Sequence, residues 1–235
     1  MGLVGPAASA VAADGAEPPA LLLHYDFFEV DGARVGDGSG HGYAGTMTAG
    51  TIVAGRRKPA VRLDGDGLIS AAASGLELGG RPLTVGAMCR PASLDGVLLS
   101  MGDARDGFAL YLKDGRPHFA VRANGVLHEV EDSEPLEVDR WVHLAGVVDA
   151  SGALSILVNA FPVATSAGPG LLARTPAGAF RVGAEGDGPI GSHDAAGRWR
   201  GLVEDVRVYG GAVSRDLHRD LLGDWANRPG CGCRK

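Results

Sequence analysis

The chain has 235 residues, of which 45% are hydrophobic, a globular fraction that excludes wholesale disorder. Its net charge of −6, with no basic run longer than residues 56–58, excludes a nucleic-acid-binding surface. No stretch approaches the roughly 18 consecutive apolar residues that a membrane-spanning helix needs, and the length fits one large domain or two small ones.

The first segment, residues 1–20, is rich in Ala, Gly and Pro. Residues 8–10 and 10–12 have the small-residue pattern of a signal-peptidase cleavage site, but the charged and apolar parts of a signal peptide are missing. We interpret the segment either as a disordered leader or as the remnant of a signal peptide whose start lies upstream. The second interpretation favours a secreted or cell-envelope location.

Short strands separated by turns dominate the rest of the chain. The patterns predict strands at residues 21–28, 61–63, 67–70, 83–89, 108–113, 118–122, 126–130, 141–149, 154–159, 180–182 and 202–209. The strongest evidence lies in the middle, where alternating apolar and polar residues are interrupted by Asp114-Gly115 and Asn124-Gly125, both typical of tight hairpins. We therefore expect an antiparallel meander with one apolar and one polar face.

The strand spacing predicts roughly eleven to thirteen strands in a sandwich or barrel and excludes a parallel βαβ architecture. One helix is expected, capped by Ser214, with Leu217, Leu221 and Trp225 on one stripe. No linker interrupts residues 21–226, which we interpret as one domain, followed by a Cys-containing tail at 227–235.

The three cysteines fall into two groups. Cys89 lies in an apolar stretch and is predicted to be a buried thiol. Cys231 and Cys233 in the tail leave three alternatives open: a vicinal-type disulfide, a metal clip or a free reactive pair.

Seven stretches, in this order, resemble motifs of the LamG-like (concanavalin A-like) jelly-roll family. They are residues 25–27 (YDF), 37–42 (DGSGHG), 60–65 (AVRLDG), 83–88 (LTVGAM), 141–149 (WVHLAGVVD), 157–159 (LVN) and 201–209 (GLVEDVRVY). The resemblance implies an all-β fold, a two-sheet antiparallel jelly-roll sandwich with one short C-terminal helix. Two departures stand out: Ala160 replaces the turn glycine after Asn159, and Glu204-Asp205 reverses the usual order.

The resemblance also implies a structural Ca²⁺, because members of this family often hold calcium near the sheet edge. The candidate ligands are Asp26, Asp37 and Glu204, since calcium takes six to eight oxygen ligands and glycine-rich loops supply carbonyls. The alternative is that Glu204 pairs with an Arg or with backbone amides, and that Asp37 caps a turn.

Candidate ligand-binding residues lie on the polar face of the meander. Tyr111, Lys113, His118 and Arg122 offer a ring and several donors to a sugar or acidic glycan, or they form a solvated face. Trp199, in the Gly-rich stretch 183–201, is a candidate sugar platform at the rim, or it packs beneath its loop.

Catalytic patterns are weak. Residues 129–134 (EVEDSE) approach the spaced carboxylates of a glycanase but fall at a strand end before Pro135, which favours a solvated acidic loop. The leading expectation is an exported, non-catalytic recognition module whose partner is a glycan or glycoconjugate. The alternatives are a concanavalin A-like polysaccharide hydrolase or lyase, and a structural or partner-binding appendage of a larger exported enzyme such as a sulfatase. Neither the ligand nor the oligomeric state follows from the sequence.

Overall fold

The computed structural model describes residues 19–73, 75–193 and 197–222. Most of the predicted leader, the tail with Cys231 and Cys233, and Trp225 lie outside these residues. Within them no helix is long and apolar enough to cross a membrane.

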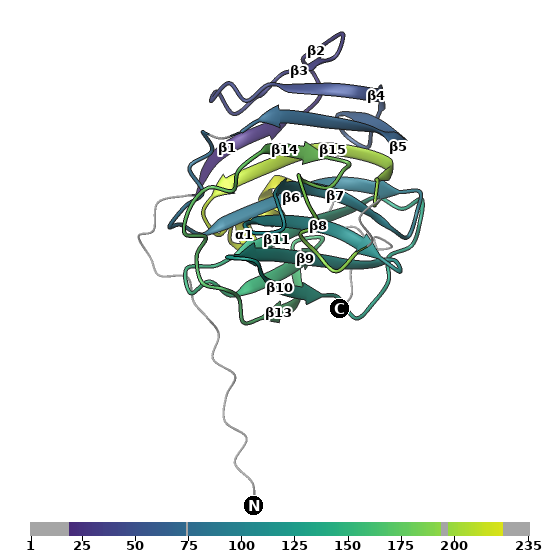
Figure 1. The fold of residues 1–235 in the computed structure, drawn as a ribbon. Coiled ribbons are helices and arrows are strands. Elements are labelled where there is room, and N and C mark those ends of the chain that lie inside the picture. The colour runs from purple at the N-terminus through teal and green to yellow at the C-terminus, as the bar shows by residue number, and fades with distance from the viewer. Residues whose placement is uncertain (1–18, 74, 194–196, 223–235) are drawn as a thin grey trace, which may run out of the picture.

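The described chain forms fifteen strands and one helix (Figure 1). The elements are β1 (Ala20–Tyr25), β2 (Val30–Asp31), β3 (Arg34–Val35), β4 (Gly45–Ala54), β5 (Pro59–Ala72), β6 (Leu83–Pro91), β7 (Gly96–Gly102), β8 (Gly107–Lys113), β9 (Arg116–Ala123), β10 (Val126–Glu131), β11 (Val142–Val148), β12 (Leu154–Val158), β13 (Phe161–Ser166), β14 (Ala179–Val182), β15 (Arg200–Gly210) and α1 (Arg215–Leu222). The predicted all-β class with one short C-terminal helix is confirmed.

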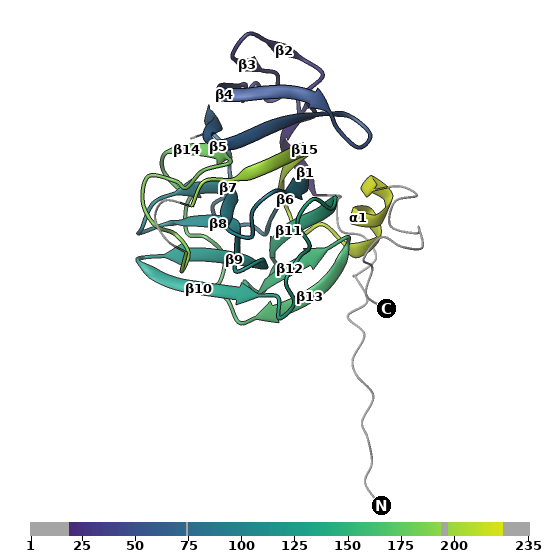
Figure 2. The same ribbon diagram turned by 90° about the vertical axis from the view of Figure 1, so that its right-hand side faces the viewer.

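Eleven of the strands form one antiparallel hydrogen-bonded path that rolls into two layers (Figure 2), and β4 pairs with β5 beside it. The path runs β10-β9-β8-β7-β14-β5-β15-β6-β11-β12-β13, and β1 pairs with β15 at one side. The two terminal strands of the path, β10 and β13, lie close together. The Ser166 hydroxyl on β13 donates a hydrogen bond to the Glu129 carbonyl on β10 at 3.3 Å. This arrangement is the predicted jelly-roll sandwich.

The tight turns follow from local turn chemistry. Asp114-Gly115 and Asn124-Gly125 both have positive φ at their two central residues (51° and 77°, 52° and 82°), as the type I′ hairpin requires. Ala160, which replaces the turn glycine, likewise has φ 69° after Asn159 at 54°, a backbone conformation that is strained for alanine.

A single large core lies between the layers. Phe108, Leu110 and Leu112 on β8 point into it, and the Phe119 ring on β9 packs over Gly146 on β11, where a Cβ would lie 2.2 Å from the ring. Because Phe119 and Gly146 belong to opposite layers, this contact sets the separation of the sheets locally.

Trp199 belongs to this core and is only 1% exposed. The prediction that it forms a sugar platform at the rim is therefore wrong, and the alternative of packing beneath its loop is the observed arrangement. Cys89 is a free, fully buried thiol, as predicted, and burial raises its pKa.

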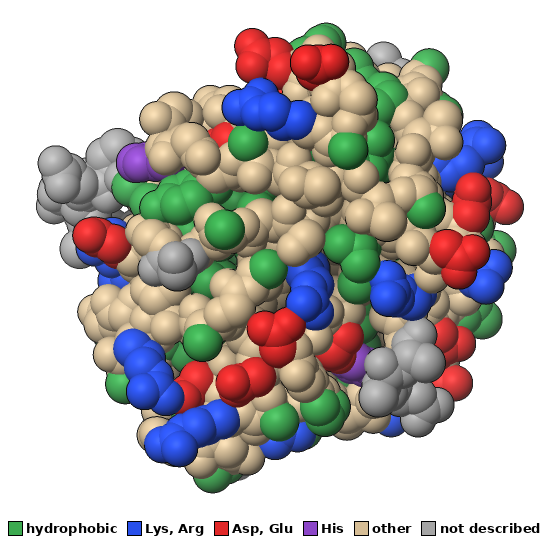
Figure 3. All heavy atoms as spheres, turned by 45° about the horizontal axis from the view of Figure 1, so that its top comes forward, with side chains coloured by type: hydrophobic (Ala, Val, Ile, Leu, Met, Phe, Trp, Pro, Cys, Tyr) green, Lys and Arg blue, Asp and Glu red, His purple; other side chains and the backbone are tan. Residues whose placement is uncertain are grey.

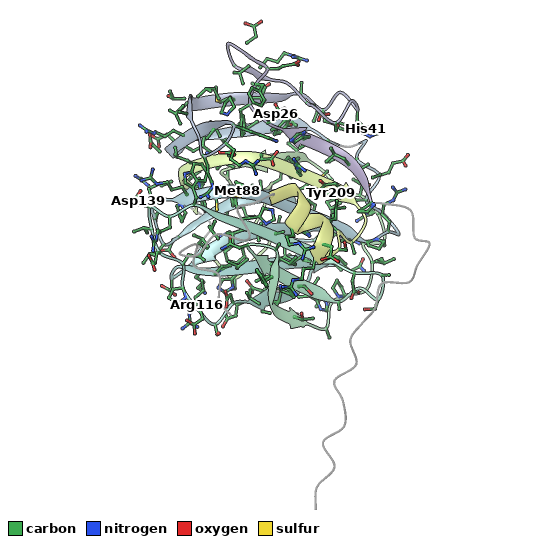
Figure 4. The ribbon with its side chains drawn as sticks, turned by 180° about the vertical axis from the view of Figure 1, so that it is seen from behind. Asp26, His41, Met88, Arg116, Asp139 and Tyr209 are labelled. Atoms are coloured by element: carbon green, nitrogen blue, oxygen red, sulfur yellow. The ribbon has the colours of Figure 1, made fainter. Side chains whose placement is uncertain are left out.

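The helix α1 lies against the back of the sandwich, beside Tyr209 (Figure 4). The Ser214 hydroxyl accepts a hydrogen bond from the Leu217 backbone N–H at 3.2 Å, which confirms Ser214 as the N-cap. The His218 ring contacts that of His143 on β11, with centroids 5.5 Å apart.

Candidate functional site

On the outer face of the sheet, the pairing of β5, β14 and β7 places polar side chains next to one another. Arg181 lies between Phe180 and Val182, which both point into the core, so its own side chain points outward. The register places Ser70 on β5 and Ser100 on β7 beside Arg181, one on each side.

The segment 183–193, which follows β14, folds back over this face. Its Ile190 side chain is fully buried against Val97, Ala109 and Tyr111 in a second, smaller apolar cluster. The Ser100 hydroxyl donates a hydrogen bond to the Ala184 carbonyl at 2.8 Å and fixes the start of the segment.

Three of the residues predicted to bind a ligand hold this segment in place. Tyr111 accepts a hydrogen bond from the Ser192 N–H at 3.0 Å, and Lys113 donates to the Ser192 carbonyl at 3.0 Å. Arg122 donates to the carbonyls of Pro189 and Ile190 at 3.0 and 2.9 Å. The prediction placed these side chains on one face correctly, but there they contact the protein's own loop.

His118 completes this cluster and is likewise enclosed. Its ring stacks on that of Tyr111, with centroids 4.9 Å apart, and Tyr111 is fully buried. Its Nδ1 lies 3.1 Å from the Glu129 carboxylate. Burial lowers the pKa of His118 and raises that of Glu129. Neither ring is open to a sugar from solvent, which corrects the prediction of a ring available for stacking here.

Beside the docked segment lies a cleft of about 370 Å³, which we call the sheet-face cleft. It is lined by Leu68, Ser70, Arg181, Ala184, Glu185, Gly186, Gly197 and Arg198. Figure 3 shows the acidic and basic side chains interspersed on this side of the molecule. Sequence reasoning missed this cleft, although the alternation of residues 180–182 indicated an outward-pointing arginine.

Arg181 is held rigidly at the cleft. Its Nη1 donates to the carbonyls of Glu185 and Gly186 at 2.7 and 2.6 Å, and its Nη2 pairs with Asp187 at 2.5 Å. A guanidinium has five donor hydrogens, so Nε–H and one Nη2–H have no partner among the residues that the structure describes. Glu185 in turn forms an ion pair with His193.

The three candidate calcium ligands each have protein partners. The Glu204 carboxylate accepts hydrogen bonds from the backbone N–H groups of Arg56, Arg57 and Lys58 at 2.6 to 3.4 Å, and Asp26 accepts one from the Phe28 N–H at 3.1 Å.

Both oxygens of Asp37 are also occupied. They accept from the N–H groups of His24, Ser39 and Tyr43 and from the Ser39 hydroxyl, at 2.8 to 3.0 Å. Burial opposes ionisation, but these hydrogen bonds outweigh it and hold the pKa of Asp37 below its usual range. Across residues 19–73, 75–193 and 197–222, no group of three or more His, Cys, Asp and Glu is arranged to hold a metal ion. Calcium binding stays a prediction.

Asp205 was not singled out by the sequence, yet it is the centre of a charge cluster. It lies in a bulge of β15 with φ 56°, and its carboxylate is 2.7 Å from His24 Nε2, 2.8 Å from Lys58 Nζ and 3.1 Å from Arg207 Nη2. Burial opposes ionisation, but these partners outweigh it and lower the pKa of Asp205. The cluster ties together β1, β15 and the β4–β5 turn.

Comparison with solved structures places the fold. Domain 4 of AbnA, an extracellular GH43 arabinanase from Geobacillus stearothermophilus solved in complex with arabinotriose, has a TM-score of 0.70 at 20% identity, over 88% of this chain and 100% of that one. The binding domain of Paraclostridial Mosquitocidal Protein 1 has a TM-score of 0.69 at 14% identity, and that of botulinum neurotoxin serotype G 0.64 at 15%. The match with the mosquitocidal protein covers 88% of this chain and 52% of that one. The match with the neurotoxin covers 86% of this chain and 50% of that one.

Comparison by sequence gives the family. No curated protein matches the chain. A family model described as the concanavalin A-like lectin/glucanases superfamily (Laminin_G_3) matches residues 63–216, which is more than half of the chain. The chain therefore belongs to the concanavalin A-like lectin/glucanase superfamily.

Proposed function

We propose that this chain is a non-catalytic recognition module, exported from the cell, that binds a carbohydrate in the sheet-face cleft. The observation that carries the proposal is the fixed Arg181 guanidinium, with two uncommitted donors, at a cleft within the roughly 300–1,000 Å³ range of small-molecule sites. Because carbonyls and Asp187 already hold the guanidinium, ligand binding requires little further ordering.

The chemistry of the lining suits hydroxyl and carboxylate groups. Arg198 is exposed, and the Ser70 hydroxyl has no hydrogen-bond partner within the described part of the chain. The backbone at Gly186 and Gly197 is free of side chains. Leu68 adds an apolar surface. A sugar presents the same mixture of hydroxyls and C–H faces, and an acidic sugar would also pair with Arg198.

The relatives support a recognition role. The arabinanase domain was solved with arabinotriose, and the two toxin fragments are binding domains. Export is supported by the cleavage-like motifs at residues 8–12 and by the extracellular arabinanase among the neighbours.

A glycan-array screen with and without EDTA, followed by calorimetric titration of the strongest hit, tests the proposal. Arg198→Ala should weaken binding at least tenfold, since a charge-assisted hydrogen bond contributes about 1.5–3 kcal/mol. Arg34→Ala, which removes an exposed arginine on β3, is the matched control and should bind normally.

Three outcomes distinguish carbohydrate recognition from the alternative functions. Silence on the array in both conditions refutes carbohydrate recognition and favours the appendage role. Release of new reducing ends from a bound polysaccharide would make the chain a hydrolase or lyase. Binding that is unchanged in Arg198→Ala would remove the sheet-face cleft from the proposal.

A further inference from the structure

A second cleft lies at the end of the sandwich, in the other layer. It has a volume of about 270 Å³ and is formed by the β10–β11 loop and the β12–β13 hairpin; Asp139 in that loop is labelled in Figure 4. Its lining comprises Glu134, Pro135, Leu136, Glu137, Arg140, Trp141, Val142, Val158, Asn159, Phe161 and Val163. We call it the end cleft.

One aromatic wall of the end cleft, the Phe161 ring, is fixed by its surroundings. The Asn159 side chain accepts a hydrogen bond from the His143 N–H at 2.9 Å, and the Asn159 N–H donates to the His143 carbonyl at 2.9 Å. These bonds hold the hairpin that carries Phe161. The Arg215 guanidinium of α1 lies 4.3 Å from the Phe161 ring centroid, a cation–π contact that holds this ring from the helix side.

The end cleft combines an apolar interior with a charged rim. Trp141 and Phe161 are both partly exposed, whereas Val142 and Val158 beneath them are buried. At the rim, Arg140 Nε donates to the Glu137 carboxylate at 2.8 Å, and both side chains remain largely exposed. The rim therefore offers donors and acceptors to a ligand that lies flat on the rings.

We infer that the end cleft is a second saccharide site, in which a sugar ring stacks on the Trp141 indole and its hydroxyls bond to the Arg140–Glu137 pair. The rim carries Glu134 and Glu137 against Arg140, so its negative balance disfavours acidic sugars and selects a neutral one. The inference rests on the proposed function for the class of ligand, but on a separate set of residues.

Two sites in different layers would let one polysaccharide chain engage the module twice. The second contact would then be intramolecular, and the apparent affinity for a long chain would exceed that for a trisaccharide.

The test titrates the full chain with neutral trisaccharides (arabinotriose, cellotriose and maltotriose), following heat and tryptophan fluorescence. We expect at least one to quench the fluorescence of the wild-type protein, and Trp141→Ala and Arg140→Ala to bind it at least tenfold more weakly. The matched control is Phe28→Ala, which removes an aromatic ring that is 64% exposed elsewhere. Arg140→Ala changes only an exposed side chain, so it decides the matter if Trp141→Ala does not fold.

The variants separate this inference from the proposed function. Loss of neutral-sugar binding in Arg140→Ala, with Arg198→Ala normal, supports the end cleft whatever the fate of the sheet-face cleft. Binding that depends on Arg198 alone overturns the end cleft and leaves the proposed function standing. No heat and no quenching with any trisaccharide overturns the inference as well.

Discussion

Replacement of Glu204 tests how the sandwich fixes its β4–β5 turn. The side chain on β15 is 2% exposed, and its carboxylate accepts hydrogen bonds from three successive backbone N–H groups, at residues 56–58. Burial raises the pKa of Glu204, partly offset by these bonds. Gly55 is required beside it, because a Cβ there would lie 2.5 Å from the Glu204 carboxylate.

The magnitude follows from the number and length of the bonds. Leaving a buried donor without an acceptor costs about 1–3 kcal/mol. The bond to Arg56 is short, at 2.6 Å, whereas those to Arg57 and Lys58 are 3.3 Å or longer. We therefore expect Glu204→Ala to lower the free energy of unfolding by about 2–4 kcal/mol. For a chain of this size, that lowers Tm by roughly 4–16 °C.

Urea denaturation followed by circular dichroism measures this loss, with Glu77→Ala, an exposed glutamate, as the control. Glu204→Asp should cost nearly as much as Glu204→Ala, because the carboxylate retreats by roughly 1.5 Å. Glu204→Gln keeps one acceptor oxygen and should cost about 1 kcal/mol. A Glu204→Ala loss below 0.5 kcal/mol, or equal losses in the Gln and Ala variants, would refute the reasoning.

Three further predictions concern packing, pH and calcium. Gly146→Ala should destabilise the protein by about 1–3 kcal/mol through its clash with the Phe119 ring. In a double-mutant cycle, adding Phe119→Leu should recover part of the lost free energy of unfolding. Losses in the two single variants that simply add in the double variant would contradict the contact. Burial lowers the pKa of His143 from 6.5 to about 3. Between pH 6.5 and about 3, the unfolded chain therefore binds a proton at this residue that the folded chain does not. The free energy of unfolding should then decrease as the pH falls through this range. His143→Gln should flatten that decline between pH 6 and 4.5 in denaturation curves, and an unchanged slope would count against it. Calcium should raise Tm relative to EDTA in the wild type and not in Asp37→Asn, whereas equal Tm values in the wild type would remove the calcium prediction.

The hairpins were predictable from the sequence because their geometry is local. Asp114-Gly115 and Asn124-Gly125 supply the positive φ values that their turns need. Five of the observed strands were not predicted, namely β2, β3, β4, β7 and β13. Two of them, β7 and β4, lack the alternation on which the prediction depends. β7 is buried on both faces, since the core lies on one side and the segment 183–193 covers the other, so its residues are mostly apolar and do not alternate. β4 is mostly exposed and offers no apolar stripe.

The site was less predictable, because it depends on contacts between distant residues. The sequence placed Tyr111 and His118 on one face but contained no sign that Ile190 would dock on that face. Trp199 was ambiguous for the same reason, since a loop aromatic can point inward or outward. Trp141 lies at the start of the predicted strand 141–149, and nothing in that pattern indicated that it would be half-buried in the wall of the end cleft. Burial of these rings is decided by tertiary packing, which alternation does not encode.

A crystal structure of the protein with the strongest array hit would locate the ligand directly. The proposal predicts sugar density in the sheet-face cleft, with hydroxyl or carboxylate oxygens within 3.2 Å of the Arg181 and Arg198 guanidinium groups. An empty sheet-face cleft beside a sugar bound elsewhere on the molecule would contradict it.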